Sequence, residues 1–178
     1  GTLECKSPEE LADVPFDPKP RQSIEAAFEN IESTITGHEA KLDEESGVTT
    51  FHWELMSPNN APIRLTFRDP NEKDAYGLFE ASFEVAPPSI ALLSHQNVLQ
   101  RLLRHNEMMW RLKFSIAEDG TIKLCCRRPA IDLDPTEVMH TIRELELHTS
   151  LLVTEIIKFR KYAEKPFQAA EFDLNQGP

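Results

Sequence analysis

The sequence predicts an α+β domain in which helices cover mainly one face of a five-stranded antiparallel sheet. Segments with apolar residues at every second position occur in two runs, and turn residues bound each segment. Segments with apolar residues three and four positions apart come before, between and after these runs. Neighbouring strands with short links form antiparallel sheets, so the expected order is α-β-β-β-α-β-β-α.

The longest expected helix covers residues 134–162. Asp134 can cap free backbone N–H groups, Pro135 suits the first turn, and Glu137 completes a capping box. An apolar stripe then follows at spacings of three and four: Val138, Ile142, Leu145, Thr149, Leu152, Ile156 and Phe159. A helix of about 28 residues is about 42 Å long. A stripe of this length needs an apolar partner surface, and the sheet is expected to provide it.

The other elements are placed by the same periodicities. A first helix is expected at residues 23–35, ended by Gly37, and a second at residues 89–105. Strands are expected near 51–55, 63–67, 79–85, 112–116 and 122–126, with a hairpin turn at 118–120. The expected inner face of the sheet consists of Phe51, Trp53, Leu65, Phe67, Phe79, Phe83, Phe114 and Leu124.

Composition indicates one soluble domain at residues 21–163, between an extended proline-rich arm (1–20) and an acidic tail (164–178). The net charge of −11 argues against nucleic acid as a partner. No stretch of apolar residues is long enough to span a membrane. Three cysteines, Cys5, Cys125 and Cys126, suggest no disulfide framework, which favours the cytoplasm.

Residues 102–142 carry a resemblance to a known fold. A leucine-rich helix end runs into Asn106 and the strand sequence at 110–114, and the 119–120 turn and the Asp134 helix start follow. With the order of elements over residues 23–162, this resembles the bacterial type III secretion chaperone fold (CesT type) and its YbjN-like relatives. The resemblance implies a small, acidic, homodimeric protein. It also implies a protein or peptide client, held as an extended segment.

Two sets of residues are candidates for protein binding or dimer contact. The resemblance implies that Leu92, Leu99 and Leu103 of the second helix face a second copy. Met108, Met109 and Trp110 form the other set, because methionine adapts to irregular partners and tryptophan often anchors interfaces. The alternative for both sets is burial inside the domain itself.

No nucleophile, acid–base pair or phosphate-binding loop has a diagnostic spacing, so we expect no enzyme and no cofactor. The expected function is binding of an extended partner segment, and a regulatory scaffold within a larger assembly is a further possibility. The alternative is a small metal-dependent enzyme or regulator that uses His140, Glu144 and His148, spaced on one side of the long helix. Two further alternatives are weaker. Cys125 and Cys126 could form a redox site, and Asp132 and Asp134 could form a paired-carboxylate site.

Overall fold

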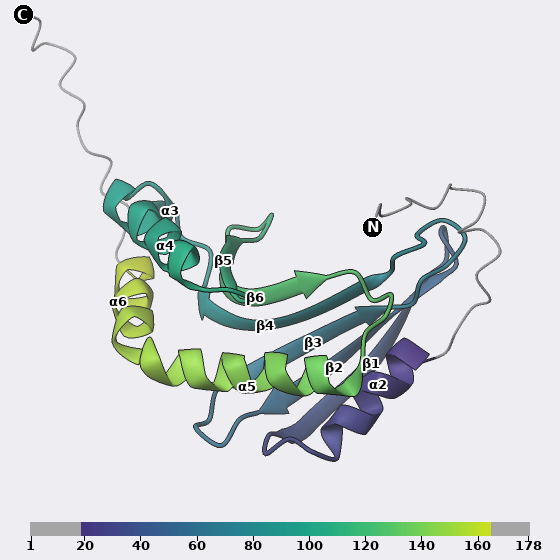
Figure 1. Ribbon diagram of the computed structural model, residues 1–178. Helices are drawn as coiled ribbons and strands as arrows, with labels where there is room; N and C mark the ends of the chain where they lie inside the picture. Colours follow the sequence, from purple (N-terminus) through teal and green to yellow (C-terminus); the bar gives the residue numbers. More distant parts are fainter. Residues whose placement is uncertain (1–18, 165–178) are drawn as a thin grey trace, which may run out of the picture.

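The structure, a computed structural model that describes residues 19–164, contains one antiparallel sheet and five helices in that range (Figure 1). The helices are α2 (Lys19–Phe28), α3 (Ile90–Leu93), α4 (Gln96–Met108), α5 (Pro135–Leu151) and α6 (Val153–Ala163). The strands are β1 (Thr34–Asp43), β2 (Val48–Met56), β3 (Pro62–Arg68), β4 (Leu78–Ala86), β5 (Lys113–Ile116) and β6 (Ile122–Arg128). The α+β class is confirmed, but the expected count of five strands is wrong because the sheet has six.

The order of elements also differs from the expected one. Four strands follow α2, then two helices, two strands and two more helices. The predicted arm and tail lie outside the described residues, except for residues 19 and 20, which begin α2, and residue 164. Among the described helices, none has the length and apolar character needed to cross a membrane.

The strands are arranged in the order β1-β2-β3-β4-β6-β5, and every neighbouring pair is antiparallel. The chain leaves β4, passes through α3 and α4 to the far edge, and returns through β6 (Figure 1). The predicted turn between β5 and β6 is confirmed: Gly120 has a φ of +88°, and the N–H of Ala117 donates to the carbonyl of Thr121 at 2.9 Å. β1 and β5 are therefore the two edge strands.

The helix expected at residues 23–35 is instead α2, and strand β1 begins within the last two residues of the expected range. The helix ends at Phe28, and Ile35 pairs with Leu55 of β2. Gly37, expected to end a helix, instead follows a register shift within β1. Residues 34–36 are all β-branched, which favours a strand. The ladder with β2 therefore outweighs the helical spacing of the apolar residues.

The inner face of the sheet is the core of the domain. All eight side chains expected there are buried, and none exposes more than 9% of its surface. The stripe of the long helix is buried too, apart from the half-buried Leu152. In Figure 1, α5 lies across this face with α2 beside it. The ring of Phe28 in α2 contacts Trp53 of β2 edge-on, at 5.8 Å between centroids. The partner surface expected for the long stripe is therefore confirmed.

Two helices expected to be continuous are broken. The C-terminal helix breaks at Leu152, so that α5 follows the sheet while α6 turns toward α3 (Figure 1). Arg160 fixes α6 at the end of β4, because its side chain donates to the backbone carbonyls of Val85 at 2.9 Å and Glu84 at 3.1 Å. The second helix breaks between α3 and α4 at residues 94–95. After these breaks, α6 packs against both α3 and β4.

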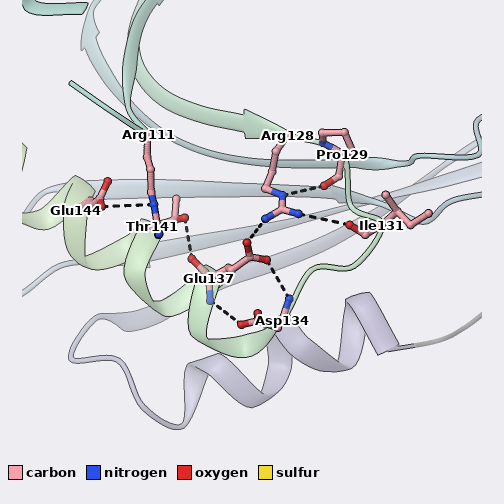
Figure 2. Close-up of polar contacts among 8 residues, drawn as sticks. All are labelled: Arg111, Arg128, Pro129, Ile131, Asp134, Glu137, Thr141 and Glu144. Carbon is pink, nitrogen blue, oxygen red and sulfur yellow. Dashed lines mark hydrogen bonds and ion pairs between the residues drawn. The ribbon is translucent and has the colours of Figure 1, made fainter. Parts of the chain in front are cut away.

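The start of α5 is held by the predicted capping box, shown in Figure 2. The Asp134 carboxylate accepts from the N–H of Glu137 at 2.9 Å, and the Glu137 carboxylate accepts from the N–H of Asp134 at 3.4 Å. Glu137 also forms an ion pair with Arg128, the last residue of β6. The same guanidinium donates to the carbonyl of Pro129 at 3.1 Å. This network ties the long helix to the sheet.

We expect Asp134→Ala to lower the free energy of unfolding by about 1 kcal/mol, because it removes the acceptor for the Glu137 N–H. Asp134→Asn is the matched control and should lose much less, since asparagine caps as well as aspartate. Urea unfolding followed by circular dichroism measures both. An alanine variant as stable as the asparagine variant would contradict the assigned role of the cap.

Candidate protein-interaction surface

Two large apolar side chains point outward where α4 gives way to β5. Trp110 exposes 98% of its surface and Met108 exposes 83%. Large apolar side chains are usually buried, and tryptophan is a frequent anchor in protein interfaces. This connection is therefore the first candidate for an interaction surface.

Neighbouring residues hold the connection in place. Met109 and Leu112, on either side of Trp110, are buried in the core. The ammonium group of Lys113 donates to the carbonyl oxygens of Asn106 and Met109, each at 2.5 Å. The Asn106 amide also bonds both backbone groups of the residue that follows Lys113, at 3.0 Å and 2.6 Å. Trp110 is thus displayed by an anchored turn and not by a loose loop.

The turn is linked to α5 by one ion pair. Arg111 lies 3.8 Å from the carboxylate of Glu144 (Figure 2). Leu147 follows Glu144 by three residues, and Leu151 follows Leu147 by four, so all three lie on the same side of α5. Leu147 is 55% exposed and Leu151 is 67% exposed. We call Met108, Trp110, Leu147 and Leu151 the corner patch. It joins exposed apolar groups from two elements that are far apart in the sequence.

The stretch around this patch is basic, although the whole chain is acidic. Residues 96–113 contain four basic side chains and one acidic one, Glu107; the basic ones are Arg101, Arg104, Arg111 and Lys113. Arg101 pairs with Glu155 of α6 at 3.0 Å, which ties α4 to α6. A negatively charged partner would therefore bind over this stretch more favourably than a positively charged one.

The structure separates the residues that the sequence grouped as a helix face. Leu92 lies in α3 and is fully buried, and the break before α4 ends the continuous face on which the prediction depended. Leu99 is half-buried against the core, and Leu103 is 68% exposed. Five residues separate Leu103 from Met108, a rotation of about 140° around a helix, so the two point in different directions.

The free edge of β1 is a second candidate surface. The strand has ten residues, and all except Gly37 are exposed. It pairs with β2 on one side, and its other side has no strand neighbour in the described sheet. An open edge presents unpaired N–H and C=O groups to an added strand. The sequence did not reveal this surface, because the start of β1 was assigned to the end of a helix and most of the strand to no regular element.

An open surface pocket of about 430 Å³ lies beside the β1–β2 turn, near the β3–β4 connection. Asp69 and Phe51 line it, together with polar residues of both connections. Burial raises the pKa of the Asp69 carboxyl, and the positive charge of Arg21 opposes that shift. Arg21 also lies over the ring of Phe51, 4.2 Å from its centroid. The arrangement joins α2 to this end of the sheet.

The proposed histidine row does not converge. His148 Nδ1 lies 2.9 Å from the backbone carbonyl of Glu144, and the Glu144 carboxylate faces Arg111. His140 is exposed on the same helix. Within residues 19–164, no group of three histidine, cysteine, aspartate or glutamate side chains could hold a metal ion. The geometry therefore gives no support to the metal-dependent alternative.

Asp132 and Asp134 have separate roles. Asp134 is occupied as the cap of α5. Asp132 is exposed and has a φ of +60°, a left-handed conformation that aspartate tolerates better than most residues. Their carboxylates are therefore explained by the connection that leads into α5, without a paired-carboxylate site.

Cys125 and Cys126 lie on opposite faces of β6, as their adjacent positions predicted. Cys126 belongs to the core, and Cys125 lies 3.2 Å from the hydroxyl of Ser115. Both are buried, and burial raises the pKa of both thiols. A raised pKa lowers the thiolate fraction at neutral pH, and the thiolate is the reactive form. This environment argues against the redox alternative.

In a Cys5→Ser variant, we expect Cys125 and Cys126 to react slowly with a disulfide reagent at pH 8. The raised pKa keeps the thiolate fraction low until the pH exceeds that pKa, and burial limits access. As the control, the same two thiols should react rapidly with the reagent once the protein is unfolded in guanidinium chloride. A native protein that reacts as fast as the unfolded one would contradict this assignment.

Comparison with protein families, and with curated proteins of known sequence, gives no match for this chain. The geometry of the corner patch and of the β1 edge therefore carries the functional argument. One signal in the sequence could have completed the patch: Leu147 and Leu151 are apolar but lie off the buried stripe of the long helix.

Proposed function

We propose that this chain is a non-enzymatic protein-binding module that holds an extended segment of a partner protein along β1. The observation that carries the proposal is the free edge of β1: ten residues long, solvent-exposed and unpaired on one side within the described sheet. A peptide in extended conformation can add to such an edge as a further strand, and its backbone hydrogen bonds then supply much of the affinity.

The opposite edge of the sheet is less suited to this role. β5 has four residues, and the side chain of Asn106 already bonds the backbone N–H and C=O of Phe114 in that strand. Short, side-chain-blocked edges resist the addition of a strand. The contrast between the two edges favours β1 as the surface for a client.

Charge contributes to the choice of client. The exposed side chains of β1 include His38, Glu39, Lys41 and Asp43, so the strand itself is mixed in charge. The chain as a whole carries a net charge of −11. Long-range attraction therefore favours neutral or basic segments at low salt, and salt weakens that preference.

Proline substitutions in β1 test the proposal. Consecutive residues of an antiparallel edge strand direct their N–H groups alternately toward the neighbour and away from it. Of Ala40→Pro and Lys41→Pro, one therefore removes an inward N–H and should destabilise β1–β2 pairing. The other variant removes an outward N–H, so it should keep the wild-type melting temperature and no longer bind the client.

Clients are recovered from a source-cell lysate, identified by mass spectrometry, and then measured as synthetic peptides by calorimetry. Ala40→Gly and Lys41→Ala keep the N–H and serve as matched controls with unchanged affinity. If the outward proline variant folds and binds the same peptides with wild-type affinity, the client does not pair with β1.

Self-pairing is the second part of the proposal. The resemblance implies a homodimer through the second helix, and the structure leaves Leu103 exposed on α4 beside the half-buried Leu99. We propose that this side of α4 contacts a second copy. A two-fold axis would place the same residues against each other, because such an interface is self-complementary.

Light scattering measures this part directly. The wild-type chain should have the mass of a dimer, and Leu103→Arg should have the mass of a monomer, because two arginines would meet across the axis. Asn97→Arg adds the same charge on a different exposed side of α4 and should leave the dimer intact. A monomeric wild-type protein at all accessible concentrations would remove this part of the proposal and leave the β1 edge unaffected.

A further inference from the structure

The corner patch is an interaction surface that neither β1 nor the Leu103 side of α4 uses. Its outermost side chains, Trp110 and Met108, belong to a turn fixed by buried neighbours and by the Lys113 ammonium group. Its other half, Leu147 and Leu151, lies on α5, which passes beside the turn where Arg111 pairs with Glu144 (Figure 2). The patch is therefore preformed, and an occupant gains apolar contact without ordering the turn first.

The charge around the patch narrows the choice of occupant. Residues 96–113 carry four basic side chains against one acidic residue, and two of the basic ones, Arg101 and Arg111, already pair with Glu155 and Glu144. The remaining positive charge, to which Arg104 contributes, favours a segment with both apolar and acidic side chains.

The segment that follows α6 starts within reach of the corner patch. α6 ends at Ala163, and the ring of Tyr162 lies 5.4 Å from the ring of His95, the residue just before α4. The chain after α6 therefore begins at the N-terminal end of α4. From there the patch is about 20 Å away, the length of a 13-residue helix at 1.5 Å per residue. Phe172 follows Glu164 by eight residues, which can span at most about 26–29 Å, so Phe172 can reach the patch.

The composition of residues 165–178 matches the surface. Phe167, Phe172 and Leu174 are apolar, and Glu171 and Asp173 are acidic. The alternation over 171–174 would direct Phe172 and Leu174 to one side of an extended segment. The carboxylates would then lie at its margin, within reach of long basic side chains such as Arg104.

We propose that residues 165–178 bind the corner patch of their own chain, with Phe172 and Leu174 against Trp110 and Met108. Tethering favours this arrangement, because a short linker gives an effective concentration in the millimolar range. The tail then acts as a built-in cover that an acidic, apolar segment of another protein must displace. The inference is independent of the proposed client site on β1.

Quenching of Trp110 fluorescence by acrylamide tests the cover. The signal of Trp110 is obtained by subtracting a Trp110→Phe variant, which leaves the buried Trp53. Removal of residues 165–178 should raise the Trp110 quenching constant about threefold, because a tether in the millimolar range keeps the site mostly occupied. A full-length Phe172→Ser, Leu174→Ser variant should behave like the truncated chain, and Gln168→Ser is the matched control that should not.

Addition in trans provides a second measurement. A synthetic peptide of residues 165–178, added to the truncated chain, should restore the protection of Trp110, and less so as salt increases. The same peptide should not bind a truncated Trp110→Ser, Met108→Ser variant. Circular dichroism confirms that each variant is folded.

Three results would overturn the proposal. Equal quenching in full-length and truncated chains would show that the tail does not cover Trp110. Protection that survives truncation but falls on dilution would assign the patch to a second copy. Protection lost only when residues 1–18 are removed would assign it to the N-terminal arm. None of these results bears on the β1 variants, so the two proposals fail separately.

Discussion

The structure depends on the burial of one apolar sheet face under helices. Trp53, Leu65, Ala81 and Cys126 are cross-strand neighbours from β2 to β6 and form one buried row across that face. α5 covers it with Val138, Ile142 and Leu145, each completely buried. Apolar burial of this kind is the main favourable term in folding. The capping box and the Arg128–Glu137 pair add orientation, because they fix where α5 begins on the sheet.

Helices cover one face of the sheet, and the other face carries pairs of polar side chains. On that face Arg64 bonds Glu54 at 2.6 Å, and His52 lies 3.1 Å from the hydroxyl of Thr66. These partly exposed polar pairs contribute little stability individually, so they leave this face hydrated without competing with the core. Within the described sheet, β1 is an edge strand and pairs only with β2. A free strand edge is a liability unless it has a partner, which is the physical basis for assigning a client to it.

The two apolar surfaces arise from the geometry of the sheet's ends. α5 ends at Leu151, and the chain turns at Leu152, so that α6 packs against α3 and the end of β4. The chain from α4 to β5 crosses this corner, and Met109 and Leu112 turn inward to fill it. Trp110 then points outward, because the inward positions are taken. The patch lies by the β5 edge and β1 is the opposite edge (Figure 1), so the tail and a client need not compete for the same groups.

The sequence by itself determined the elements whose patterns are local. The inner face of the sheet, the stripe of the long helix, the α5 capping box and the hairpin at Gly120 are confirmed, since periodicity and turn chemistry act between residues close in the chain. Tertiary structure decided the rest. An edge strand exposed on most sides needs no apolar alternation, so β1 is recognised only through its ladder with β2. The break at residue 152 lets α6 pack against α3 and the end of β4, which are far from it in the chain. Leu92 is buried and Trp110 is exposed, because exposure depends on which distant elements pack over each residue.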